Sequence, residues 1–73
     1  MSKFVRCMKY EDVHSGSGKA DLIFLAMTAI KYVQTVRGVG SIATDYDGSR
    51  YYCVADNAPP WDNGDFKDCI VEL

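Results

Sequence analysis

Three cysteines, Cys7, Cys53 and Cys69, and a single histidine, His14, are the residues of this sequence best suited to metal binding or nucleophilic catalysis. The cysteines are widely spaced, without a Cys-x-x-Cys pair, and one imidazole cannot complete a zinc site with them. Their odd number also argues against a disulfide scaffold. We therefore expect buried, reduced, structural thiols, no metal, no cofactor and no enzymatic activity.

Two other stretches have the composition of a ligand-binding loop but not its spacing. A phosphate-binding loop would need glycine at Val13 and Ser or Thr at Ala20, which leaves only a weak anion site at a helix N-terminus beside Lys19. An EF-hand loop aligned on Gly48 would place Val54 at the bidentate twelfth ligand position. We interpret Glu11–Gly18 as a flexible connection and the stretch around Gly48 as a turn.

Charge is distributed unequally along the chain, although the net charge is only −2. Residues 1–37 carry six basic and three acidic side chains, whereas residues 38–73 carry two basic and seven acidic ones. Aromatic side chains are interleaved with the aspartates of the acidic half, and rigid aromatic anchors beside carboxylates suit a surface that docks on a basic partner. The candidate partner-binding residues are Asp45, Asp47, Tyr52, Trp61, Asp62, Asp65, Phe66 and Asp68.

This acidic, aromatic half predicts a small non-enzymatic protein-interaction module that binds a basic surface of a larger protein. Its size and charge suit an inhibitor of the kind that phages and mobile elements encode, of the anti-CRISPR or DNA-mimic type. The alternative is a nucleic-acid-binding module that uses the basic N-terminal third, with Lys3, Arg6, Lys9 and Lys19 as phosphate contacts and Tyr10 for stacking. No RNP or KH signature supports that alternative.

The element expected to organise the chain is an amphipathic helix over Asp21–Arg37. Its apolar stripe recurs at helical spacing, its start is marked by Ser17 or Asp21 as N-cap and its end by Gly38. Phe24 and Met27 fall outside the stripe, which makes them candidates for a self-contact in a homodimer. An open strand edge is a second candidate for that contact. The stripe residues are Leu22, Ala26, Ala29, Val33 and Val36.

Strands are expected on both sides of this helix. Lys3–Tyr10 is rich in β-favouring residues, and we expect its Phe4, Met8 and Tyr10 face to be buried. Ser41–Tyr46 and Ser49–Ala55 flank Asp47-Gly48, which predicts a β-hairpin with a two-residue type I′ turn. That turn would place Asp45 opposite Arg50 and Thr44 opposite Tyr51, and would expose Tyr52.

The chain end CIVEL predicts a last short strand after a loop over Asp56–Phe66. The expected fold is therefore a single α+β domain over residues 1–73, with one helix packed on a three- or four-stranded antiparallel sheet in the order β-α-β-β-β. No apolar run approaches the roughly 20 residues of a membrane span, and the N-terminus lacks the features of a secretory signal. We expect an intracellular protein that does not bind membranes.

Overall fold

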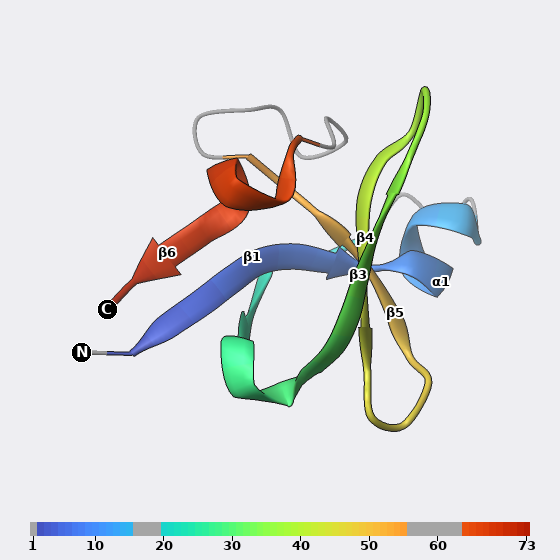
Figure 1. Cartoon of the computed structure of the whole chain (residues 1–73). Helices are drawn as coiled ribbons and strands as arrows, with labels where there is room; N and C mark the ends of the chain where they lie inside the picture. The colour runs from blue at the N-terminus through green and yellow to red at the C-terminus, as the bar shows by residue number, and fades with distance from the viewer. Residues whose placement is uncertain (1, 16–19, 56–63) are drawn as a thin grey trace.

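The structure, a computed structural model, describes residues 2–15, 20–55 and 64–73. Its strands form one antiparallel sheet, which has six strands within the described residues (Figure 1). The elements, in chain order, are β1 (Lys3–Lys9), α1 (Tyr10–His14), β2 (Ile23–Ala26), the 3₁₀ turn η1 (Met27–Ala29), β3 (Ile30–Val36), β4 (Gly40–Asp45), β5 (Arg50–Cys53), the 3₁₀ turn η2 (Phe66–Cys69) and β6 (Ile70–Glu72).

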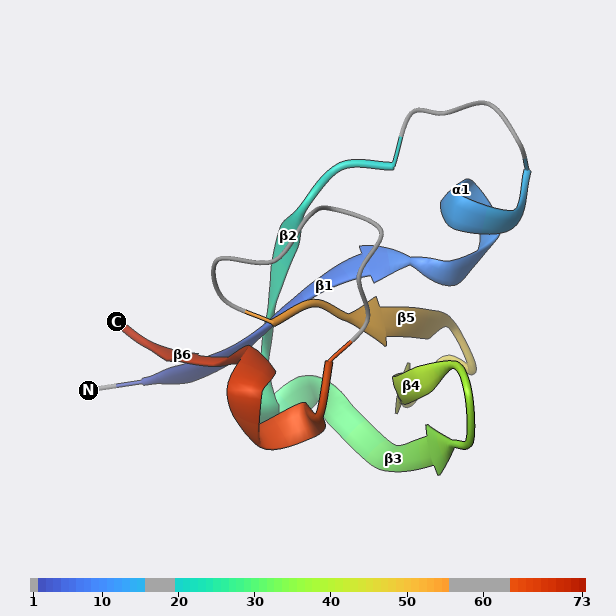
Figure 2. The same cartoon turned by 90° about the horizontal axis from the view of Figure 1, so that it is seen from above.

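The strand order is β2-β1-β5-β4-β3, and β1 pairs with three strands, β2, β5 and β6. β2 pairs with one edge of β1. The other edge is shared, because β5 pairs with the C-terminal half of β1 and β6 with its N-terminal half (Figures 1 and 2). The two chain ends consequently lie side by side, and Ser2 and Leu73 exchange two backbone hydrogen bonds.

The core lies on one face of this sheet. Its buried members come from β1, β4, β5 and η2, and partly buried side chains from β2, η1, β3 and η2 pack around them. The sheet is twisted, as Figures 1 and 2 show. The buried members are Val5, Cys7, Ala43, Tyr51, Cys53 and Cys69.

The opposite face is partly covered as well. Met8, Tyr52 and Ile42 are neighbours across three strands, and both Met8 and Ile42 are buried. Helix α1 packs against β1 and β5. Because both faces of the central strands are covered, β4 is buried at four successive positions instead of alternating between buried and exposed.

The prediction of an α+β fold with a helix over Asp21–Arg37 is wrong. That segment forms β2, η1 and β3, and the fold is mostly β (Figure 2). Leu22 and Val36, two members of the predicted buried stripe, are 40% and 39% exposed. Gly38 has a φ of 80° and belongs to the β3–β4 turn, so it ends a strand and not a helix.

Of the predicted stripe, only Val33 is among the side chains of this segment that pack against the core. Ile23 and Leu25 face the core at strand spacing, and the 3₁₀ turn then brings Met27 to the same side. A bulge between Ile30 and Tyr32 shifts the register, so that Ile30 and Val33 both pack against the core although they are three residues apart. The turn and the bulge thus change the step between core-facing residues from two to three without forming a helix.

The first strand is confirmed, but the face that joins the main core is that of Val5 and Cys7, and on the predicted face only Met8 is buried. Val5 and Cys7 are fully buried, whereas Phe4 is only partly buried and Met8 belongs to the opposite face. The Val5 face is compatible with burial because Lys3 and Lys9 lie at the exposed ends of the strand. The expected flexible connection begins with the short helix α1 (Tyr10–His14).

The hairpin is confirmed, but its register differs by one residue from the prediction. Thr44 pairs with Arg50 and Ile42 with Tyr52, since the loop has three residues instead of two. Asp45 N–H donates to Ser49 O at 3.0 Å, and Gly48 takes a φ of 89° at the last loop position. This is a turn followed by a glycine bulge. Asp45 therefore does not face Arg50.

The last strand is confirmed as β6. The predicted loop over Asp56–Phe66 lies mostly outside the described residues. In the described part of the chain, no helix has the length and apolar character that a membrane span requires.

Candidate functional site

The β4–β5 turn is held by hydrogen bonds to the carboxylate of Asp45. Asp45 Oδ1 accepts hydrogen bonds from the backbone N–H of Asp47 and of Ser49, both at 2.9 Å. Asp45 Oδ2 accepts a third from the hydroxyl of Tyr51 at 2.9 Å, and Tyr51 is itself anchored in the core. An aspartate that caps its own turn favours this loop over the two-residue loop.

Electrostatics support this arrangement. Desolvation alone would raise the pKa of Asp45, but hydrogen bonds from Tyr51 and from the backbone of the turn outweigh it and lower that pKa. Burial, followed by the bond to Asp45, raises the pKa of Tyr51. At neutral pH Asp45 is therefore ionised and accepts the hydrogen bond, and Tyr51 is protonated and donates it.

Tyr46 stands at the first position of this locked loop, and it is 69% exposed. Asp47, the next residue, is exposed as well. From the sequence, Asp45 and Asp47 are partner-binding candidates, whereas Tyr46 is only one of the aromatic residues interleaved with the aspartates and is not in the candidate set. The signal that could have found it is the order Asp-Tyr-Asp-Gly, in which an aspartate caps a loop that places the following aromatic residue at its tip.

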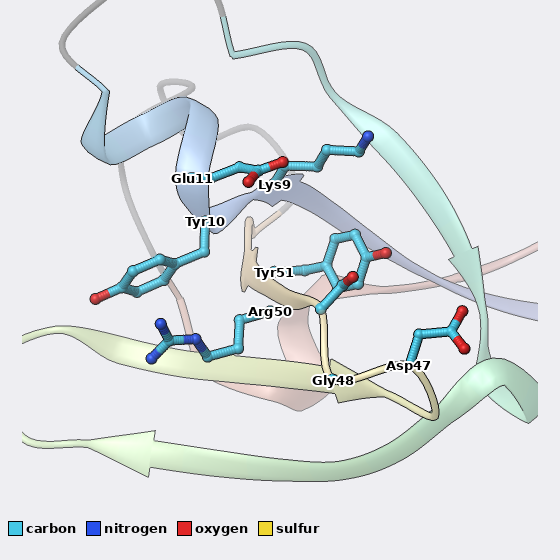
Figure 3. Close-up of a pocket in the computed structure, with 8 residues that line it drawn as sticks. Lys9, Tyr10, Glu11, Asp47, Gly48, Arg50 and Tyr51 are labelled. Atoms are coloured by element: carbon cyan, nitrogen blue, oxygen red, sulfur yellow. The ribbon is translucent and has the colours of Figure 1, made fainter.

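A polar pocket of about 350 Å³ lies behind the turn, between the end of β1, the start of α1 and the start of β5. Figure 3 shows Lys9 and Glu11 on one side of it, with Arg50 next to the ring of Tyr10 and Asp47 on the turn. Two cations and two carboxylates line the same space. The lining therefore selects neither an anion nor a cation, and we assign no ligand to it.

An aromatic stack adjoins the pocket. The ring of Tyr10 stacks on His14 with centroids 4.1 Å apart and on Tyr52 at 5.0 Å, and the guanidinium of Arg50 lies 4.4 Å from the Tyr10 centroid. His14 Nε2 and the Tyr52 hydroxyl are hydrogen-bonded. These groups contact one another and join α1 to β5, so the stack fastens the helix to the sheet. Tyr52, a predicted partner contact, is part of it.

The three thiols gather in the core, as expected for structural cysteines. Cys7 and Cys53 are opposite each other on β1 and β5, and Cys69 Sγ donates to Asp65 O at 3.2 Å. All three are free. Burial raises the pKa of Cys7 and Cys53 to about 12 and that of Cys69 to about 11. Within the described residues no group of His, Cys, Asp or Glu is arranged to hold a metal ion.

The remaining partner-binding candidates do not join the turn. Asp65 and Asp68 are exposed at η2, which lies apart from the β4–β5 turn in both views (Figures 1 and 2). Phe66 is partly buried and packs against the core. Trp61 and Asp62 lie outside the described residues.

The other candidates are scattered. Phe24 is 51% exposed on β2, and Met27 is partly buried against the core. Lys3 and Lys9 occupy opposite ends of β1, and Arg6 lies between them on the other face of the strand. Lys19 lies outside the described residues. The basic candidates that the structure describes therefore do not form one patch.

Comparison of the chain with models of known protein families, with curated proteins and with solved structures finds no match.

Proposed function

We propose that this chain is a protein-interaction module that docks the tip of its β4–β5 turn on a basic surface of a larger protein. The observation that carries the proposal is Tyr46, which is 69% exposed on a loop held by three hydrogen bonds to Asp45. The module would act on its partner by occupying that surface.

An exposed tyrosine on a rigid loop is well suited to binding. Tyrosine supplies a large contact area, and it is one of the residues that most often dominate the binding energy of an interface. Binding normally costs the entropy of ordering a loop. Here Asp45 and Tyr51 hold the loop before any partner arrives, so much of that cost is already met by folding.

Charge indicates the nature of the partner. Asp47 is exposed beside Tyr46, and the second half of the chain carries an excess of carboxylates. Carboxylates around an aromatic anchor accelerate encounter with a basic surface and repel acidic ones. The polar pocket is lined by both cations and carboxylates, and the rings of the aromatic stack contact one another. Neither feature therefore favours a partner of one charge.

The test compares variants that leave the sheet intact. The tagged chain, Tyr46→Ala and Asp47→Asn are used as baits in a nuclease-treated extract of the native host. Phe24→Ala is the matched control for loss of an exposed aromatic side chain, and Asp68→Asn is the control for loss of an exposed carboxylate. A partner identified in this way is purified, and its dissociation constant is measured for each variant.

We expect Tyr46→Ala to weaken binding by about 30-fold or more, the effect of losing a hot-spot side chain of about 2 kcal/mol. Asp47→Asn should mainly lower the association rate, and the loss should shrink as salt is added. Phe24→Ala and Asp68→Asn should bind as the unchanged chain does. Equal recovery of the same partners by Tyr46→Ala and Phe24→Ala would refute the proposal.

A further inference from the structure

Strand β3 is an edge strand, and it is as long as β1 inside the sheet. It spans seven residues, and among the described residues it pairs only with β4. Edge strands in soluble proteins are commonly short, interrupted by proline or guarded by several charges. In β3 the five residues after Lys31 carry no charge and no proline, and they favour β structure.

The ladder determines which backbone groups face outward. Asp45 N–H points toward β5, because it donates to Ser49 O. Since backbone groups alternate along a strand, Thr44 and Ile42 point the other way, toward their partners Tyr32 and Gln34 on β3. The N–H and C=O groups of Val33 and Thr35 therefore point away from the sheet and are oriented to receive another strand.

We propose that the occupant of this edge is β3 of a second copy of the chain, paired antiparallel about a two-fold axis at Val33. In this register Val33 faces Val33 of the second copy, and Lys31 faces Thr35 of the second copy at both ends. No two like charges meet. Centring the pair on Thr35 would lose contacts, because β3 ends at Val36.

Exposed side chains on β3 become covered in this register. Tyr32, which is 46% exposed, would lie opposite Gln34 of the second copy, and the two Tyr32 rings would be diagonal neighbours within reach of each other. Val36, which is 39% exposed, would lie opposite Ile30 of the second copy. Because the same strand contributes both sides, the contact closes on itself as a dimer and does not propagate into a fibre.

The test uses charge at Thr35, an exposed position whose side chain is absent from the core. Thr35→Lys would place like charges opposite each other twice, and Thr35→Glu would place a carboxylate opposite Lys31 twice. Dimer dissociation constants are measured by sedimentation equilibrium. Thr28→Lys, an exposed change outside β3, is the matched control, and circular dichroism verifies the fold of each variant.

We expect the unchanged chain to dimerise with rising concentration. Thr35→Lys should raise the dissociation constant roughly 2- to 30-fold, and Thr35→Glu should lower it by a similar factor. The sign is diagnostic. The chain has a net charge of −2, so an added lysine reduces the overall repulsion between copies and an added glutamate increases it, the reverse of what the register predicts.

The double variant Lys31→Glu with Thr35→Lys should restore dimerisation. A chain that stays monomeric up to about 1 mM would overturn the proposal and leave the edge to a strand of a different protein. The proposed register would be overturned if Thr35→Lys and Thr35→Glu changed the dimer dissociation constant in the same direction. It would also be overturned if Thr28→Lys changed that constant as much as Thr35→Lys does.

Discussion

Val5 and Val36 are the same residue type in two environments, and their replacement by alanine tests the arrangement of the sheet. Val5 is fully buried where β1 pairs with β2 on one side and β6 on the other, opposite Leu25 and Ile70. Val5→Ala removes two methyl groups at about 0.8 kcal/mol each, and the cavity left behind adds up to about 1 kcal/mol. We expect a loss of about 1.6 to 2.6 kcal/mol.

Val36 is 39% exposed at the end of β3, so Val36→Ala leaves no enclosed cavity and should cost less than about 1 kcal/mol. For a chain of 73 residues the total free energy of unfolding is about 4 to 11 kcal/mol, so the Val5 change is a large fraction of it. It should lower the Tm by roughly 6 to 20 °C.

The assay is urea unfolding followed by far-ultraviolet circular dichroism, at a protein concentration low enough to keep the chain monomeric. The denaturant dependence should be equal for both variants, so that the midpoints report stability. A helix over Asp21–Arg37 would bury Val36 in its apolar stripe and give the opposite order. An equal or greater cost at Val36 than at Val5 would therefore refute the sheet arrangement described above.

Three further predictions concern the core and the turn. In the folded chain Cys7, Cys53 and Cys69 should resist iodoacetamide at pH 8, and all three should react in guanidinium, because burial raises each thiol pKa to about 11 or 12. Gly48→Ala should destabilise the chain by about 1 to 2 kcal/mol in thermal unfolding, since a φ of 89° is strained for alanine although no atom obstructs its Cβ. The pKa of Asp45 is lowered on folding, so its contribution to stability is present above its unfolded value of 3.8 and is lost as pH falls further. In unfolding measured between pH 2 and 6, Asp45→Asn should remove the part of the stability loss at low pH that comes from Asp45. An unchanged dependence of stability on pH would contradict the hydrogen bonds assigned to Asp45.

The elements that were predictable from sequence are those whose signals are local. A run rich in β-favouring residues marked β1, an Asp-Gly pair between two alternating runs marked the hairpin, and a short apolar run marked β6. The burial of the three cysteines also followed from their type and spacing. In each case the residues that carry the signal are the residues that form the element.

The segment over Asp21–Arg37 failed because its structure depends on distant partners. β2 forms against β1 and β3 against β4, and neither contact is visible in the segment itself. Without those partners, three- and four-residue spacing indicates a helix. The high content of β-branched and aromatic residues was the competing signal, and the gain from non-local pairing decided the outcome.

The candidate site shows the same limit at smaller scale. Asp47 and Gly48 identified the turn, but the loop length depends on the side chain of Asp45, which bonds two N–H groups of the loop. One additional loop residue changes which side chain is presented at the tip. Tyr46 was therefore noted only as one aromatic residue of the acidic half and not selected as a site residue, although the turn that carries it was correctly located.

The two proposed surfaces have a joint consequence. Ile30 is paired with Asp45, so the β4–β5 turn lies near the start of β3. In a dimer centred on Val33 the two turns would be offset by about six residues along the strands and three strand spacings across them, which separates the Tyr46 tips by roughly 25 Å. Such a dimer would present two anchors and bind a partner with two matching sites more tightly than either anchor alone. Tyr46→Ala would then reduce binding by both forms, whereas Thr35→Lys would reduce only the gain from the second anchor, so that the two proposals can fail independently.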